Sequence, residues 1–295
     1  MNFSANWRSI FSEKLTANFS FGYDHYDYRN DESVEEAAAA RLSFAINQWF
    51  GKVDFSYKLD NNHTLNFGLM SQFYNINSGT YEPLHESSLV KWDQLQKDKA
   101  LESAIYIGDQ WEITPKLSVN AGIRYSMFNL LGPRTYYTYQ DGMLPSSTTV
   151  VDSVSVGGGK VVKTYQGPEF RLSARYAFND DFSVKAGFNT MRQYIHKVSN
   201  TTIMSPTDTW KLSDTNIKPQ NGWQLAAGAY YNTPGQVLEL SVEGYYKKLN
   251  DYLDYRSSAR LIMNHHLETD VINTEGYASV SYTHLRAHET LSDLV

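Results

Sequence analysis

The sequence predicts an all-β protein, a transmembrane antiparallel β-barrel, and three observations support this prediction. Short polar turns recur near positions 12, 62, 115, 180 and 234, and each leads into a stretch of alternating apolar and polar residues. Longer polar connections separate these hairpins, as in barrels with short turns at one rim and long loops at the other. Many stretches run for about ten or more residues, whereas soluble strands usually have five or six and bilayer-spanning strands roughly 9–11.

The stretch after the third turn shows the alternation most clearly. From Leu117 to Met127, odd-numbered positions are apolar and even-numbered positions are polar or glycine. Successive side chains of a strand point to opposite faces, so one face is apolar and the other polar. The polar faces of several such stretches carry full charges, which a wet lumen tolerates and a lipid face does not. We therefore expect these residues to face the lumen: Arg124, Arg171, Arg175, Lys185, Glu239 and Glu243.

Turn-forming residues mark the short connections, among them Asp60-Asn61-Asn62, Asn179-Asp180-Asp181 and Thr233-Pro234-Gly235. The pattern predicts about ten complete strands and an eleventh that begins near Thr274. The long connections are expected at about 29–48, 77–99, 130–165, 195–217 and 250–273.

Composition limits the other classes of protein. The chain has 295 residues and no stretch of 18 apolar residues, which excludes transmembrane helices. Its mean hydropathy of −0.48 is compatible with a barrel, because only every second side chain of a barrel strand faces lipid. The net charge of −6 argues against nucleic acid as a partner. The lack of cysteine excludes disulfides, thiol catalysis and cysteine-based zinc sites.

No motif indicates an enzyme. Gly157-Gly158-Gly159-Lys160 lacks the Ser or Thr that follows the lysine of a phosphate-binding loop, so we interpret it as a flexible loop. His265 and His266, with Glu268 and Asp270, are a weak metal-site candidate, because adjacent residues on a strand point to opposite faces. We expect no catalytic residue, no metal site and no cofactor.

Aromatic residues in the long connections are the candidate substrate contacts. Aromatic side chains in loops can clamp sugars or a siderophore. The alternative is that they belong to an aromatic girdle at the membrane interface or pack the loops together. The candidates are Trp92, Tyr136, Tyr137, Tyr139 and Trp210.

Residues 205–220, SPTDTWKLSDTNIKPQ, lead into a strand that begins near Trp223 and continues to Gly228. This segment resembles the barrel of TonB-dependent outer-membrane receptors, most closely those of Bacteroidetes-type bacteria, in which a loop enters a strand through a Leu/Ile-Lys-Pro-Glu segment. Gln220 replaces the usual acidic residue. Residues 242–276 also resemble these receptors, and the similarity covers roughly residues 1–277.

The resemblance implies a 22-stranded barrel that encloses an N-terminal plug domain in the bacterial outer membrane. It implies active uptake of a scarce nutrient (a siderophore, cobalamin, a glycan or a peptide), driven by the proton gradient of the inner membrane. The implied partners are outer-membrane lipid, the TonB complex through a plug segment that this chain lacks, and a surface lipoprotein. Residues 1–279 would form about half of such a barrel.

Residues 280–295 are interpreted as a non-native tail. The segment 281–290, SYTHLRAHET, breaks the strand alternation and resembles a translated sequencing adapter.

Two alternatives remain for the function of the chain. A passive porin or adhesin barrel would lack a plug domain encoded upstream, and a soluble carbohydrate-binding β-sandwich would not fractionate with membranes.

Overall fold

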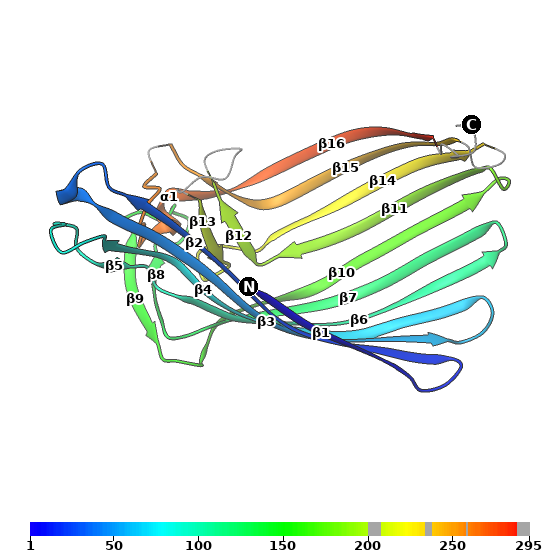
Figure 1. Ribbon diagram of the computed structural model, residues 1–295, viewed down its shortest axis with the longest axis horizontal. Coiled ribbons are helices and arrows are strands. Elements are labelled where there is room, and N and C mark those ends of the chain that lie inside the picture. Colours follow the sequence, from blue (N-terminus) through cyan, green and yellow to red (C-terminus); the bar gives the residue numbers. More distant parts are fainter. Residues whose placement is uncertain (200–207, 234–237, 258, 288–295) are drawn as a thin grey trace, which may run out of the picture.

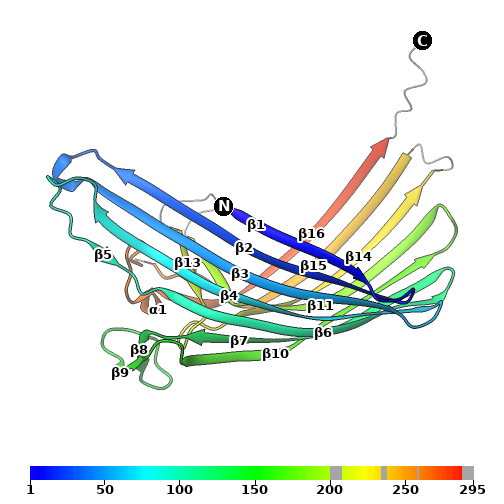
Figure 2. The same cartoon turned by 60° about the horizontal axis from the view of Figure 1, so that its bottom comes forward.

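The computed structural model describes residues 1–199, 208–233, 238–257 and 259–287, with side chains placed up to residue 280. A 12-stranded antiparallel sheet dominates it and curves into a trough (Figure 1, Figure 2). The strands follow the chain order across this sheet, and β1 and β16 lie at its two edges. They are β1 (Asn2–Ile10), β2 (Leu15–Glu32), β3 (Ala40–Lys58), β4 (His63–Pro83), β6 (Asp98–Thr114), β7 (Leu117–Leu131), β10 (Val161–Ala177), β11 (Phe182–Gln193), β14 (Gln220–Asn232), β15 (Leu238–Tyr255) and β16 (Val271–Ala287), with β5 (Asp93–Gln94) paired to β4.

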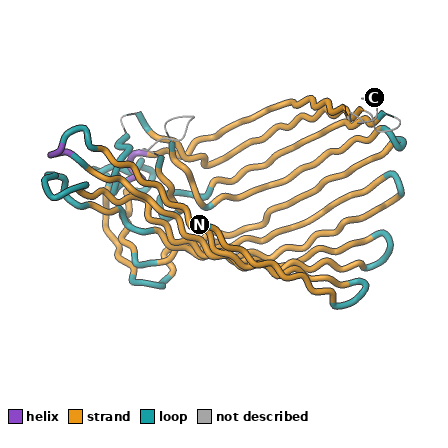
Figure 3. Tube along the Cα trace, viewed as in Figure 1, coloured by secondary structure: helices purple, strands orange, loops and turns teal. Residues whose placement is uncertain are grey.

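Two further hairpins lie in the long connections, β8 (Arg134–Tyr139) with β9 (Val150–Val156) and β12 (Ile195–Val198) with β13 (Thr209–Leu212). The described helices are one 3-10 turn, η1 (Glu36–Ala38), and the four-residue α1 (Leu267–Asp270). Figure 3 shows how little helix the described chain contains and that the hairpin insertions gather at one end of the sheet. None of the helices described is long and apolar enough to cross a membrane.

The short turns are stabilised by the same device at four places. A side-chain oxygen at the start of each turn accepts hydrogen bonds from the backbone N–H groups two and three residues later, which closes the turn. The residues that supply the oxygen are Ser12, Asp60, Thr114 and Asn179. These four turns lie where the sequence predicts them, and the predicted turn at Pro234-Gly235 lies outside the described residues.

The strands extend further into the connections than the sequence predicts. The connection expected at 29–48 is mostly strand, because β2 continues to Glu32 and β3 begins at Ala40. The connection expected at 250–273 is shortened at both ends, because β15 continues to Tyr255 and β16 begins at Val271. The alternation of apolar and polar residues ends where neither face of the strand needs to be apolar, but the backbone hydrogen bonds between the strands continue beyond that point. Cross-strand polar contacts support this extension, such as the 2.7 Å ion pair from Arg41 Nε to Asp31 Oδ1.

The two faces of the trough differ in chemistry. Apolar side chains on the convex face are exposed, and Ile105, Leu172 and Leu225 keep more than half of their surface. Polar and charged side chains alternate with them on the concave face. A single curved sheet with an exposed apolar face does not have the two packed sheets of a β-sandwich, so this fold differs from the β-sandwich of the soluble alternative.

The hairpin β12–β13 covers the concave face at the end where the long connections gather (Figure 2). Leu212 and Tyr194 pack there against an apolar patch on the sheet, in which Phe128 stacks on Tyr194 with ring centroids 4.7 Å apart. The Tyr194 hydroxyl lies 2.8 Å from Ser126 Oγ, and Ser78 Oγ donates to the Trp210 carbonyl at 2.8 Å. These contacts hold the hairpin against the sheet.

Candidate functional site

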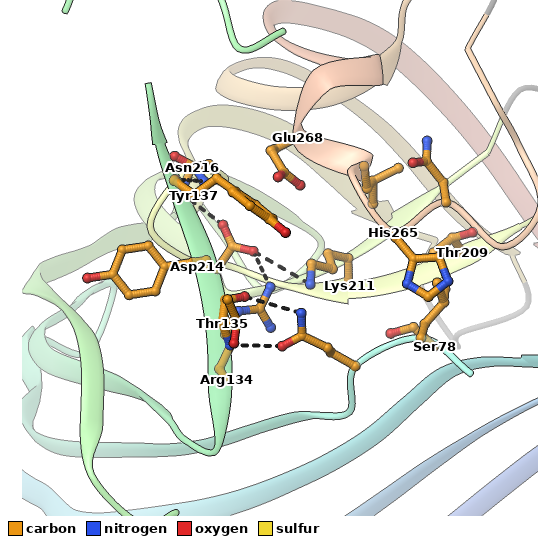
Figure 4. Close-up of a pocket in the computed structure, with 15 residues that line it drawn as sticks. Ser78, Arg134, Thr135, Tyr137, Thr209, Lys211, Asp214, Asn216, His265 and Glu268 are labelled. Atoms are coloured by element: carbon orange, nitrogen blue, oxygen red, sulfur yellow. Dashed lines mark hydrogen bonds and ion pairs between the residues drawn. The ribbon is translucent and has the colours of Figure 1, made fainter. Parts of the chain in front are cut away.

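A pocket of about 50 Å³ lies where four of the long connections meet. Its walls come from the β4–β6 connection, from β8, from β13 with the residues after it, and from the turn at α1. Polar side chains dominate the lining, and Tyr136, Tyr137 and His265 supply rings (Figure 4). The volume is sufficient for a terminal chemical group or a few water molecules, and too small for a whole nutrient molecule.

A buried network of four charged residues lies at the floor of this pocket, where Arg134, Lys211 and Asp214 line it and Asp98 lies beneath them. Arg134 donates to Asp214 Oδ2 at 2.8 Å and also contacts Asp98, while Lys211 Nζ lies 3.0 Å from Asp98 Oδ2. Asp98 is fully buried and also accepts from the Leu212 backbone N–H. Burial opposes the charge of Arg134, but the two carboxylates outweigh it and raise its pKa above the usual value. The network joins β6, β8 and β13.

A second polar group lies at the α1 turn. The Tyr139 hydroxyl donates to Glu268 Oε1 at 2.9 Å, and burial together with this carboxylate raises the pKa of Tyr139. The rings of Tyr137 and His266 are 5.0 Å apart. His265 Nε2 lies 3.0 Å from both carboxylate oxygens of Asp93, which ties the turn to β5. Among the described residues, no group of three or more His, Cys, Asp or Glu side chains is placed to hold a metal ion.

The structure brings three of the five predicted aromatic contacts together. Tyr136 and Tyr137 line the pocket, and Tyr139 reaches it through Glu268. Trp210 packs instead against the apolar patch under the hairpin β12–β13. Trp92 is 62% exposed and does not line the pocket.

Sequence reasoning missed the charged residues of the pocket. Arg134, Lys211 and Asp214 lie in connections without periodicity, and the network joins residues up to 116 positions apart, Asp98 and Asp214. No spacing in the sequence indicates which loop residues will meet. The tyrosines at 136, 137 and 139 were the one local signal for this region.

The charged residues expected in the lumen all lie on the concave face, as the strand register shows. Arg124 bridges Glu102 and Glu169 at 3.1 and 2.9 Å, and Arg171 lies opposite Gly122, two positions from Arg124 on the same face of β7. This polar layer lies next to the apolar patch that the hairpin covers.

The remaining members lie on β10, β11 and β15. Arg175 and Lys185 are direct cross-strand partners, and Lys185 Nζ lies 4.6 Å from the centroid of the Tyr230 ring. The Tyr230 hydroxyl donates to Glu243 Oε1 at 2.6 Å. Glu239 lies on the same face of β15 as Glu243, opposite Asn232.

The comparisons with known proteins agree with this architecture. The family model described as TonB dependent receptor-like, beta-barrel matches residues 2–281. Among similar solved structures, the copper transporter OprC has 12% identity and a TM-score of 0.66, and the match covers 98% of this chain and 44% of that chain. The ferripyoverdine receptor of the outer membrane of Pseudomonas aeruginosa has 11% identity and a TM-score of 0.61, with coverage of 98% and 38%. The ferric-catecholate import receptor Fiu of E. coli K12, in its closed form, has 11% identity and a TM-score of 0.59, with coverage of 99% and 45%. A comparison with curated proteins gives no match.

Identities this low establish the fold alone, and the chain spans less than half the length of each of these structures. The family match covers nearly the whole chain and confirms the predicted barrel class and its outer-membrane location. The boundary at 279/280 and the non-native tail stay predictions; the backbone of β16 continues to Ala287, and residues 288–295 lie outside the described part. The chain belongs to the TonB-dependent receptor-like β-barrel family of outer-membrane proteins.

Proposed function

We propose that this chain forms about half of the wall of an outer-membrane receptor that takes up a scarce nutrient with energy delivered through TonB. The observation that carries the proposal is the hairpin β12–β13, which covers the concave face and joins the charged floor of a loop-lined pocket. A passive pore needs an open water path along this face, whereas a receptor needs loops arranged around a ligand. The covered face therefore favours the receptor over a porin.

The nutrient contacts in this proposal lie at the loop end of the trough. Tyr136 and Tyr137 contact the group that enters the pocket, Tyr139 acts through its hydrogen bond to Glu268, and the exposed Trp92 offers a ring to the arriving ligand. Trp210 acts indirectly, by holding the hairpin against the sheet. The similar solved structures are named for copper, ferripyoverdine and ferric-catecholate transport; a siderophore, cobalamin, a glycan or a peptide are the classes proposed for this chain.

The proposal also assigns partners to surfaces. Outer-membrane lipid contacts the apolar convex band, and the charged concave face, with Arg171, Arg175, Lys185 and Glu243, borders the lumen. The TonB complex acts through a plug segment of the full-length protein, and a surface lipoprotein covers the loop end. The family and the solved relatives are receptors and transporters, which supports a function without catalysis.

Deletion of the complete gene, with and without a functional TonB complex in the host, tests this function. We expect growth under nutrient limitation to fall in the gene deletion and to be restored by the complete gene only when TonB is present. Restoration without TonB would indicate a passive pore instead. Recovery of the full-length protein in the soluble fraction would reject the membrane receptor altogether.

A further inference from the structure

Glu268 is a largely buried carboxylate without a close cation. Its side chain is 14% exposed, and the hydrogen bond found for it comes from the neutral hydroxyl of Tyr139. Among the described basic groups, His266 is the one within 4 Å of this carboxylate, and its Nδ1 lies 3.8 Å from Oε1, beyond hydrogen-bond distance. Arg134 interacts with Glu268 electrostatically but forms no ion pair with it within that distance. Buried carboxylates are normally paired with a cation, because the loss of hydration is otherwise uncompensated.

Around the pocket, the charge of Glu268 is not balanced by an ion pair with an arginine or lysine of the described chain. Arg134 and Lys211 are each held between the carboxylates of Asp98 and Asp214. Two cations therefore face two carboxylates in the floor, and Glu268 adds a third carboxylate to the wall. A ligand group with negative charge would be repelled here, whereas a cation would complete the balance.

A separate observation indicates that a ligand bound in this pocket would also carry a hydrogen-bond acceptor oxygen. Arg134 lines the pocket with a side chain only 9% exposed, and its buried Nε has no hydrogen-bond partner among the described residues. Both of its terminal nitrogens are used by Asp98 and Asp214. An unpaired buried N–H is costly, so an oxygen atom of a ligand would be favoured beside it.

We propose that the pocket binds a protonated amine with a neighbouring neutral oxygen, such as the carbonyl of an amino-terminal peptide unit or the hydroxyl of an amino sugar. The ammonium group contacts Glu268, and Tyr137, which lines the same pocket, supplies an aromatic ring near it. In Figure 4, Glu268 enters the pocket from the top and Arg134 from the bottom, with Lys211 between them. A pocket of about 50 Å³ accepts such an end group while the rest of the molecule stays outside.

This inference rests on the proposed uptake function and narrows its substrate class to nutrients that carry an amine. The test uses the purified full-length receptor and isothermal titration with trilysine at low ionic strength. Triglutamate and maltotriose serve as the anionic and neutral probes. We expect trilysine to bind, triglutamate not to bind, and the trilysine affinity to fall as salt is added.

Two variants locate the binding. Glu268→Gln removes the charge and keeps an acceptor for Tyr139, and it should weaken trilysine binding by about tenfold or more. Asp141→Asn removes one charge from the exposed turn between β8 and β9 and does not line the pocket, so it should change the affinity by less than about twofold. Hydrogen exchange of residues 134–139 in Glu268→Gln checks that the wall is intact.

The proposal is overturned if trilysine does not bind at millimolar concentration, if triglutamate or maltotriose binds equally well, or if Glu268→Gln binds trilysine like the parent protein. These outcomes are distinct from a failure of the uptake function. Loss of TonB dependence in the growth experiment rejects the receptor itself. Intact TonB-dependent uptake without amine selectivity rejects only the assignment of the pocket.

Discussion

Arg134 and Lys211 show how single residues hold the loop end of this protein together. Each is largely buried, and each spans two carboxylates that come from different connections. An ion pair in such a position adds little over an apolar pair, but removal of one partner leaves a buried charge without compensation. The residues at this site are therefore more sensitive to truncation than their neighbours at the surface.

Arg134→Met is expected to release the β8 hairpin and the segment after β13, at a cost of about 3–5 kcal/mol, because Asp98 and Asp214 would share one remaining cation. Limited proteolysis of the loops in the folded full-length receptor measures this release. Arg41→Met is the matched control, since its partner Asp31 lies in an exposed pair at the ends of β2 and β3. Equal protease resistance of Arg134→Met and the parent would show that the network does not hold the loops.

His196 makes the same region sensitive to acid. It is 3% exposed on β12, lies opposite Lys211 on β13, and contacts Ser213 Oγ at 2.9 Å. Burial lowers its pKa from 6.5 to about 4, although Asp214 acts in the opposite direction. The undocked hairpin binds the proton more readily, so docking is fully stable above pH 6.5 and weakens as the pH falls towards 4.

We expect the docked hairpin to lose up to about 2 kcal/mol between pH 7 and pH 5 through His196. Hydrogen exchange of residues 209–213, corrected for the intrinsic effect of pH, measures the loss. In His196→Gln, which keeps a polar side chain beside Ser213, the difference between the two pH values should largely disappear. A pH effect of the same size in this variant would assign it to other groups.

At the scale of elements, the sequence predicts the hairpins well and their ends poorly. The alternation from Leu117 to Met127 indicates β7 because one face needs apolar side chains and the other does not. Beyond the apolar band both faces are polar, so the same ladder continues without a pattern, as in the extension of β2 to Glu32. The pocket could not be predicted for a related reason, since its partners, such as Asp98 and Lys211, meet only through the tertiary fold.

The turn that joins β10 to β11 depends on one side chain. Asn179 Oδ1 accepts from the backbone N–H groups of Asp181 and Phe182 at 3.1 and 2.6 Å. Asn179→Ala should destabilise this hairpin by about 1 kcal/mol, seen as a lower urea midpoint for the refolded full-length receptor. Asn179→Asp keeps the acceptor oxygen and should stay close to the parent. If both variants have the same midpoint, the turn does not need this acceptor.

For the whole molecule, the two faces of the trough set its orientation to lipid and water. Leu172 and Ser173 are neighbours on β10, both are exposed, and they point to the convex and concave faces respectively. Ser173 lies opposite Gly187 on the concave face, where the facing positions carry small or polar side chains. A charged side chain at position 172 would therefore face the hydrocarbon of the membrane, whereas the same side chain at position 173 would face the polar lumen.

Leu172→Arg is expected to cost about 2–4 kcal/mol in a bilayer, because the guanidinium would have to leave water for the hydrocarbon band. Ser173→Arg introduces the same side chain one residue away and should cost much less, since the concave face already carries Arg171 and Arg175. Folding yields of the full-length receptor in lipid vesicles, read from the heat-modifiable gel shift of the folded barrel, compare the two variants directly. Equal yields would contradict the assignment of the convex face to lipid, and a lower yield for Ser173→Arg would reverse it.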